Sequence, residues 1–249
     1  MEERITSRKN PYLQQVKKLL SSRKEREKLG LFVSDGTKLL EEAVRYWPGL
    51  ETVILADGVE AQVPDSVRKL RVPGEVMESI SPMETPQGAL FVCRLPRKAA
   101  FVPQPGMLLL DGIQDPGNLG TILRTADALK VPVGILEGCA DPWSHKVVRS
   151  SMGAVFRSPV VVTTWEEASD ACRRAGVPLA VTALSQRAED IRSSRLGEMA
   201  VVIGSEGRGV RQEILQSADR ELIIPMAPHC ESLNAAVAAT IVMWQMEKL

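Results

Sequence analysis

The chain has 249 residues, which is enough for one large domain or two modest ones with a buried core. Its hydrophobic content of 44% and charged content of 25% are those of an ordinary globular protein, and its formal net charge of zero does not point to a polyanionic partner for the whole molecule. The longest apolar stretch, 233–244, is too short to span a bilayer, so we expect no membrane segment.

The cysteines and histidines do not form a recognisable framework. No C-x-x-C pair is present, so we expect reduced thiols and neither a disulfide nor a zinc site. Two histidines cannot form a metal site without additional carboxylate ligands, and no carboxylate spacing in the sequence suggests such ligands. The amino terminus is charged where a signal peptide would be apolar, which predicts a cytoplasmic protein. The cysteines are Cys93, Cys139, Cys172 and Cys230.

The first thirty residues are basic, with nine basic side chains against four acidic ones. Residues 10–28 have a helical pattern in which an apolar stripe lies opposite most of the lysines and arginines. This asymmetry favours a phosphate-rich ligand at the amino end, although a solvated helix face would have the same pattern. The candidate phosphate contacts are Arg8, Lys9, Lys17, Arg23 and Lys24.

Short strands and helices alternate through the first third of the chain. This alternation predicts a small α/β domain over residues 1–96. The segment 94–106 contains three prolines and shows no period, so we place a linker at 97–106. The predicted strands lie at 31–33, 52–56, within 65–71 and at 88–93, and the helices at 37–47 and 75–80.

Longer βα units follow over residues 107–249. Near-continuous apolar strands of this kind predict a parallel sheet covered on both faces. The last helix, 232–247, is apolar almost all round, which is typical of a helix buried in a core or in a subunit interface. The predicted strands lie at 107–110, 131–136, 159–163, 178–182, 199–203 and 221–224, and the other helices at 119–129, 145–152, 166–175 and 211–217.

The stretch 107–129 contains the first of three polar motifs. An apolar strand is broken by Asp-Pro-Gly, and Asn118 opens a helical pattern that carries Arg124. A strand–turn–helix unit places its turn at the carboxyl edge of a sheet, where polar groups are free to meet a ligand. An alternative for Asn118 is an ordinary helix cap, and for Arg124 a surface charge.

The second motif is the glycine-rich turn 204–209, which has the pattern G-x-x-G-x-G. It matches neither the dinucleotide fingerprint nor a phosphate-binding loop. Glycines at the end of a strand still allow a flat or charged ligand to approach the backbone closely. Glu206 in this turn is a candidate hydrogen-bond acceptor, or simply a solvated carboxylate.

The third motif, 223–234, has the sequence IIPMAPHCESLN. Pro225 halts a strand, and Ser232 is a candidate cap for the last helix. Asn234 is a polar amide in an otherwise apolar helix, and a buried amide needs a partner. The alternative for these residues is a purely structural role, as a helix cap and as a hydrogen bond in the core.

Taken together, the motifs D-x-x-x-D-P-x-N-x-G-x-x-x-R-T-A, G-S-E-G-x-G and I-P-M-x-x-x-x-E-S-L-N-x-x-V-A closely resemble the SpoU/TrmH branch of the SPOUT RNA methyltransferases. The resemblance extends over residues 107–249, including RSSMGAVFRSP at 149–159. The stretch 31–43 is similar to the family's small substrate-binding domain, with Asp35 where an acid precedes a glycine. Pro228 and Ala235-Ala236 depart from the family pattern, which leaves their local cofactor contacts open.

The resemblance implies an α/β fold in which a carboxyl-terminal parallel-sheet SPOUT domain with a deep trefoil knot follows a small substrate-binding domain. It implies S-adenosylmethionine as cofactor, methyl transfer to a ribose 2′-hydroxyl of RNA, and a homodimer through the carboxyl-terminal domain in which one subunit completes the other's site. The implied catalytic residues are Arg124, Asn118, Glu206 and Asn234. The implied cofactor contacts are Thr182, Gly204, Glu206, Ile224, Met226, Ser232, Leu233 and Asn234.

The chemistry limits what Arg124 can do. A ribose hydroxyl is a poor acid, so a group must stabilise the developing alkoxide. The family's arginine is often treated as a general base, but a guanidinium stays protonated in proteins. We therefore expect Arg124 to act electrostatically, with Asn118, Glu206 and Asn234 orienting it and the ribose.

The full-length substrate domain favours rRNA over tRNA as substrate, by analogy with the family. A tRNA 2′-O-methyltransferase and a non-catalytic RNA-binding ribosome-assembly factor remain alternatives. The presence of Asn118, Arg124 and Asn234 argues against the non-catalytic protein. A third alternative is an α/β domain that binds another nucleotide, but this sequence contains no phosphate-loop signature.

Overall fold

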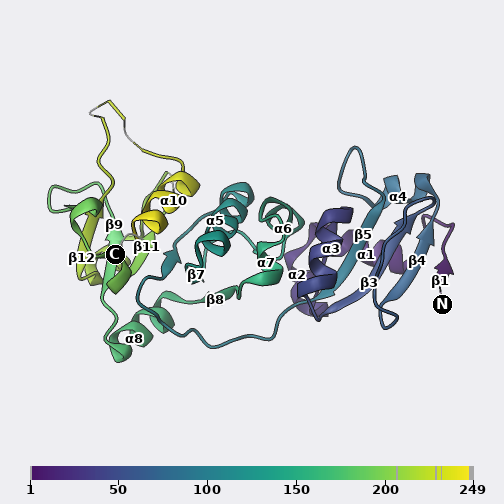
Figure 1. Cartoon of the computed structure of the whole chain (residues 1–249), viewed down its shortest axis with the longest axis horizontal. Coiled ribbons are helices and arrows are strands. Elements are labelled where there is room, and N and C mark those ends of the chain that lie inside the picture. Colours follow the sequence, from purple (N-terminus) through teal and green to yellow (C-terminus); the bar gives the residue numbers. More distant parts are fainter. Residues whose placement is uncertain (1, 206, 228, 231, 247–249) are drawn as a thin grey trace. The chain divides into compact units, whose positions relative to one another are not determined.

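The computed structural model describes residues 2–205, 207–227, 229–230 and 232–246. Its contacts divide the chain into two compact units (Figure 1). Unit 1 consists of Met1–Arg97 and Asp141–Arg157, and unit 2 of Lys98–Ala140 and Ser158–Leu249. No helix among the described residues is long and apolar enough to cross a membrane. The predicted boundaries 1–96, 97–106 and 107–249 stay a prediction.

Unit 1 is built on a mixed five-stranded sheet. Its strand order is β1-β4-β3-β5-β2, in which β1, β4 and β3 are parallel while β5 runs antiparallel to both of its neighbours. These elements are β1 (Glu2–Arg4), β2 (Leu31–Asp35), β3 (Leu50–Ala56), β4 (Arg68–Val72) and β5 (Ala89–Arg94). The predicted strands of this region are confirmed, and β1 adds a charged strand that no apolar alternation signalled.

Helices of unit 1 cover both faces of this sheet. Successive strand residues point to opposite faces, and Phe32 and Val33 of β2 show this directly. Val33 joins a core formed with helices α1 (Pro11–Ser21) and α4 (Gly74–Ile80). Phe32 packs on the other face against Trp47 and Phe156, with ring centroids 5.9 and 6.3 Å away. Helix α3 (Thr37–Tyr46) contacts β2 and β5.

The basic helical segment is two helices and not one. Helix α1 ends at Ser21, and α2 (Arg23–Leu29) begins after Ser22, whose backbone is extended. Ser22 caps α2, because its side-chain oxygen accepts a hydrogen bond from the Glu25 N–H at 3.3 Å. A period of 3.6 residues continues across such a break, which is why the sequence pattern suggested one helix.

The segment Asp141–Arg157 belongs to unit 1, although it follows a strand of unit 2 in the sequence. Its helices α6 (His145–Ser150) and α7 (Ala154–Arg157) contact β2 and α3, respectively (Figure 1). Trp143 packs on Phe32 with ring centroids 5.1 Å apart. Apolar burial therefore attaches this segment to the amino-terminal sheet.

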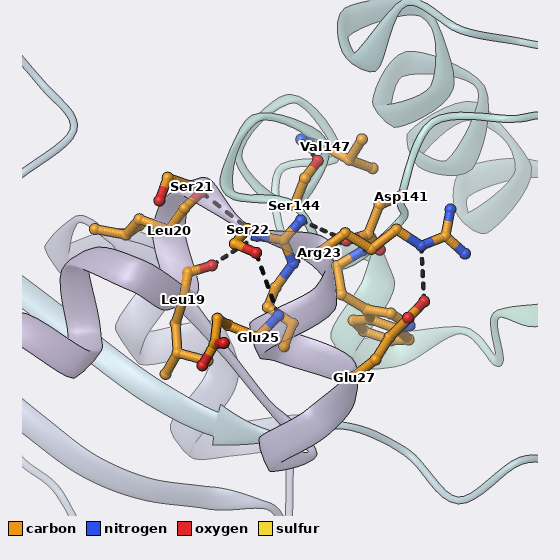
Figure 2. A network of polar contacts seen from close by, with 12 residues as sticks. Leu19, Leu20, Ser21, Ser22, Arg23, Glu25, Glu27, Asp141, Ser144 and Val147 are labelled. Carbon is orange, nitrogen blue, oxygen red and sulfur yellow. Dashed lines mark hydrogen bonds and ion pairs between the residues drawn. The ribbon is translucent and has the colours of Figure 1, made fainter.

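A buried ion pair fixes the same segment to the amino-terminal helices. Arg26, 5% exposed, donates from Nη2 to Asp141 Oδ2 at 2.6 Å and from Nη1 to the Leu19 carbonyl oxygen at 2.6 Å. Figure 2 shows Leu19 near the end of α1, Ser22 before the start of α2, and Asp141 in one network of polar contacts. Arg26 is thus a structural residue, and it does not contribute to the basic surface that its charge suggested.

Unit 2 contains a parallel seven-stranded sheet with the order β10-β12-β9-β11-β6-β7-β8. Every neighbouring pair in it is parallel, which confirms the predicted sheet. The strands are β6 (Leu108–Leu110), β7 (Val133–Leu136), β8 (Val161–Thr163), β9 (Leu179–Thr182), β10 (Glu189–Asp190), β11 (Ala200–Ile203) and β12 (Arg220–Ile223).

Helices complete unit 2 on both sides of the sheet. Helix α8 (Trp165–Ala175) and α9 (Gln212–Ser217) share a core with β9 and β11, while α5 (Pro116–Leu129) packs against α10 (Ala235–Met246) (Figure 1). Two short 3-10 turns lie at Ile191–Ser193 and Leu196–Glu198. Because the strands are parallel, the loops that follow β12, β9, β11, β6 and β7 gather at one edge of the sheet.

Candidate active site

The first motif forms the beginning of α5. Asp115 is the helix cap, and its side-chain oxygen accepts a hydrogen bond from the Asn118 N–H at 2.7 Å. Pro116 occupies the first turn, where a missing N–H costs nothing. Asn118 is therefore not the cap that the sequence alternative suggested.

Asn118 meets Asn234, which lies 116 residues further along the chain. The amide Nδ2 of Asn234 donates to Asn118 Oδ1 at 3.0 Å. Oδ1 of Asn234 accepts hydrogen bonds from the N–H groups of Ala236 and Val237 at 3.0 and 3.3 Å, so Asn234 caps α10. The expectation of a buried amide within the helix was wrong, because Asn234 is exposed and precedes α10; Ser232 is not the cap.

Arg124 lies on α5 and is exposed. In the described part of the chain it makes no hydrogen bond or ion pair, and it does not line either cavity described below. The structure therefore brings Asn118 and Asn234 together but leaves Arg124 outside that contact.

The glycine-rich turn follows β11 and folds back on itself. Ser205 and Gly209 exchange two backbone hydrogen bonds, of 3.1 and 2.9 Å. A Cβ on Gly204 would lie 2.0 Å from the carbonyl carbon of Gly209, so only glycine fits at this position. Glu206, predicted to be both a catalytic and a cofactor-binding residue, lies outside the described residues, as does Pro228.

A first cavity, of about 690 Å³, lies among the loops that follow β9, β11 and β12. It brings together residues from far apart in the sequence. Leu184, which the sequence analysis missed, is 69% exposed and also lines it. The predicted cofactor contacts that line this cavity are Thr182, Gly204, Ile224, Met226, Ser232 and Leu233. Asn234 is not among the described lining residues.

The geometry of the first cavity suits a cofactor of the size of S-adenosylmethionine. Its volume lies within the range of ligand pockets, about 300–1,000 Å³. Gly207 and Gly209 line it, and a Cβ added to either would meet nothing within 4 Å. The turn therefore leaves room beside its backbone that side chains would fill.

A second cavity, of about 720 Å³, lies among the loops that follow β6, β7 and β11. Asn118, Glu137 and Arg211 line it, together with Ser205 and other residues of the glycine-rich turn that also line the first cavity. The two cavities thus share one wall. The sequence analysis missed the second cavity, although Asp111, the first residue of the D-x-x-x-D-P motif, marks its edge.

Arg211 at this second cavity pairs with three carboxylates, those of Asp111, Glu137 and, at 3.0 Å from Nη1, Glu213. Its backbone N–H and Nε donate to the two oxygens of Asp111 at 2.8 and 2.7 Å, and its Nη1 donates to Glu137 at 2.8 Å. Burial by itself lowers the pKa of Arg211, but the hydrogen bonds to Glu137 and Asp111 outweigh burial and raise it. The guanidinium is therefore fixed in position and remains charged.

The other polar groups of interest are the candidate metal ligands and the predicted phosphate contacts of unit 1. Within the described ranges, no group of three or more His, Cys, Asp or Glu side chains could hold a metal ion. Arg8 and Arg23 pair with Glu75 and Glu27, respectively, which leaves the lysines as the more available charges. The predicted phosphate contacts, all exposed, are Arg8, Lys9, Lys17, Arg23 and Lys24.

A buried charge cluster in unit 1 was also missed. Asp35, 2% exposed, accepts hydrogen bonds from His145 Nε2 and, at 2.9 Å, from Arg149 Nη1. Burial raises the pKa of this carboxyl, but the hydrogen bond from His145 and the charges of His145 and Arg149 outweigh burial, so that the pKa is lowered. The cluster joins β2 to α6, which gives it a structural role.

Comparison with known proteins agrees with this architecture. Residues 105–244 match the model of the SpoU rRNA Methylase family, and residues 10–90 match the MRM3-like substrate binding domain. The chain is 34% identical, over 98% of its length and 99% of the relative's, to the 23S rRNA (guanosine(2553)-2′-O)-methyltransferase RlmP of Bacillus subtilis.

Solved structures of RNA methyltransferases are also similar to this chain. The S-adenosylmethionine-bound rRNA methyltransferase of Sinorhizobium meliloti is similar with a TM-score of 0.87 and 27% identity, over 99% of this chain and 98% of that one. A protein studied for 2-OH methylation of C/U34 on tRNA is similar with a TM-score of 0.51 and 26% identity, over 59% of this chain and 91% of that one.

The fold and the site are those of an RNA 2′-O-ribose methyltransferase that uses S-adenosylmethionine. The chain belongs to the SpoU rRNA Methylase family, with an amino-terminal substrate-binding domain of the MRM3-like type. The resemblance found from its three motifs is thereby confirmed. A trefoil knot stays a prediction.

Proposed function

We propose that the RNA substrate is ribosomal, and that the methylated nucleotide is a guanosine of the large-subunit rRNA. The supporting observation is that the Bacillus subtilis relative, named for that reaction, covers almost the whole chain. The tRNA-related structure matches only 59% of the chain. A substrate-binding domain over residues 10–90 therefore goes with the rRNA relatives.

We further propose that the first cavity holds the cofactor. Thr182, Gly204 and Met226 come from three different loops around it, and backbone groups next to the glycines allow close approach. The bound cofactor would supply an electrophilic methyl group. Glu206 is kept as a proposed contact on the basis of the motif alone.

The chain's own part in the reaction is to align the ribose and to stabilise charge. Asn118 and Asn234 hydrogen-bond each other at the starts of α5 and α10, so each fixes the orientation of the other. We propose that Arg124 stabilises the developing alkoxide, and that the proton leaves to water or phosphate. A guanidinium remains protonated in proteins, which argues against its acting as the base.

We propose that the enzyme works as a homodimer through its carboxyl-terminal domain. Val237 and Trp244 on α10 are 48% and 55% exposed, and their spacing of seven residues puts them on one face. Exposed Arg124 on the adjacent helix α5 would then be able to reach the site of a second copy. An rRNA substrate in a bacterial relative supports the proposal that the enzyme acts in the cytoplasm.

The test is Arg124→Ala. We expect S-adenosylmethionine binding within about twofold of the wild type in calorimetric titration, and loss of methyl transfer to large-subunit rRNA transcripts by roughly 100-fold or more. Arg173→Ala, which removes another exposed arginine of unit 2, should leave both unchanged.

Three outcomes would reject different parts of the proposal. An active Arg124→Ala enzyme would remove Arg124 from the chemistry. A wild-type protein that binds rRNA but no S-adenosylmethionine would favour the non-catalytic assembly factor. Mapping 2′-O-methyl positions in total RNA from cells with and without the gene would identify the nucleotide, and a tRNA position would refute the ribosomal substrate.

A further inference from the structure

We propose that the second cavity is a binding site for the base of the acceptor nucleotide, and that Arg211 binds a carbonyl oxygen of that base. The proposal rests on the proposed function, since it places the substrate of the same reaction. It assigns a role to a cavity that motif residues line only in part, and to an arginine that lies outside the three motifs.

The position of the cavity relative to the first one supports this role. Ser205 and Gly207 line both cavities, so the two cavities adjoin at this turn. Methyl transfer needs the donor and acceptor atoms about 3–3.5 Å apart. An acceptor beside a cofactor in the first cavity therefore has to lie against this shared wall, and Asn118 faces the second cavity from the other side.

Two glycines give the second cavity a floor without side chains. Gly112 and Gly138 follow the neighbouring strands β6 and β7, with φ angles of 66° and 91°. A Cβ on Gly138 would lie 4.0 Å from the Cα of Gly112, and one on Gly112 would lie 4.0 Å from the Cβ of Ser205, with no closer neighbour in either case. A flat base can therefore lie directly on the backbone there.

Arg211 supplies a fixed donor at this floor. Asp111 is 1% exposed, and both of its oxygens bind Arg211, while Glu137 binds Nη1 and also accepts from the Trp165 N–H at 3.1 Å. The remaining nitrogen, Nη2, is buried and has no hydrogen-bond partner among the described residues.

A buried N–H without an acceptor is costly, and native structures rarely leave one. The Arg211 side chain as a whole is 37% exposed and lines the second cavity, so an acceptor atom of the substrate can satisfy Nη2 once the guanidinium turns toward it. Carbonyl oxygens of bases accept hydrogen bonds from arginine, and guanine O6 is the most frequent example in nucleic-acid complexes. This agrees with the guanosine proposed as the acceptor.

The test is a substitution that places a side chain in the second cavity without changing the lining of the first cavity. Asn tolerates positive φ better than other side chains, so Gly138→Asn places an amide in the second cavity with the least backbone strain. Gly138 does not line the first cavity as described. Gly176→Asn is the matched control, because Gly176 has a φ of 66°, lies in unit 2, and a Cβ there would meet nothing within 4 Å.

We expect Gly138→Asn to bind S-adenosylmethionine within about twofold of Gly176→Asn, and to methylate large-subunit rRNA transcripts with a kcat/KM on the order of 100-fold lower. Gln114→Phe is a second variant at an exposed position that lines only the second cavity, and it tests the same point if Gly138→Asn fails to fold. We expect roughly tenfold lower kcat/KM for it, because the added ring occupies space in the second cavity and displaces the acceptor, also with cofactor binding retained.

Methylation by folded Gly138→Asn or Gln114→Phe at the rate of the control would overturn the proposal. It would do so without affecting the proposed function, because the control enzyme would still bind cofactor and methylate RNA. If the control itself binds cofactor but methylates no rRNA, the proposed function has failed, and with it the proposal that depends on it.

Discussion

Asp35→Ala should destabilise unit 1 strongly. Asp35 is buried with both oxygens engaged, and its removal leaves His145 buried without its acceptor. Breaking a buried ion pair by deleting one partner costs about 3–5 kcal/mol. Arg149 is 39% exposed, so water can replace part of its interaction. We therefore expect a loss near the lower end, about 3 kcal/mol in the free energy of unfolding.

Urea denaturation followed by tryptophan fluorescence measures this loss. Trp47 and Trp143 lie in the aromatic cluster around Phe32, so they report on unit 1. With a slope of about 2 kcal/mol per molar urea, a loss of about 3 kcal/mol moves the unit 1 midpoint down by about 1.5 M. Because two units can unfold separately, the transition of unit 2 serves as an internal reference.

The pH dependence gives an independent check on Asp35. Its pKa is lowered in the folded protein, so its contribution to stability is fully present above the ordinary value of 3.8 and is lost as the pH falls through the lowered value. The stability difference between the wild type and Asp35→Asn should thus be constant near neutral pH and shrink below about pH 4.

Asp57→Ala is the control, since it removes an aspartate from an exposed pair with Arg4 and should leave the midpoint unchanged. The reasoning about Asp35 fails if Asp35→Ala moves the midpoint by less than about 0.5 M, or no more than the control does.

Two further predictions concern unit 2. Asn234→Asp keeps an oxygen that can cap α10 but removes the Nδ2 donor to Asn118. The free energy of unfolding should therefore stay near that of the wild type, while methyl transfer in single-turnover assays falls about 10-fold. Wild-type activity of this variant would mean that the amide serves only as a helix cap. Val237→Glu should convert a dimer to a monomer in sedimentation analysis. Val162→Glu, at a valine with the same 48% exposure, should leave the dimer intact. If both variants are dimers, the interface does not include Val237 of α10.

The regular elements of this fold were largely predictable, because apolar periodicity reports local burial. What periodicity does not report is the unit in which a helix is buried. The helix at His145–Ser150 was expected from its pattern, but it contacts strand β2, whose Asp35 lies more than a hundred residues earlier. Short charged elements such as Glu2–Arg4 carry no apolar signal and depend on a partner strand, here β4.

The candidate site was only partly predictable, for a related reason. The motif residues around the first cavity come from loops that a parallel sheet brings to one edge, so their convergence could be expected from topology. Arg211 gave no signal because an arginine after a glycine-rich turn has the pattern of a solvated charge. Its significance depends on Asp111 and Glu137, which end two other strands and become its neighbours only in the folded sheet.

The shared wall also determines which substitutions can separate cofactor binding from RNA binding. Gly204 leaves no space for a Cβ against Gly209, so backbone packs directly on backbone in the turn. Ser205, Gly207 and Gly209 line both cavities, so a substitution at any of these three positions alters both. Thr182 and Gly138 each line only one of the two described cavities. Substitutions at Thr182 and Gly138 should therefore affect cofactor binding and methyl acceptance separately, which substitutions at the three shared glycine-rich-turn positions cannot do.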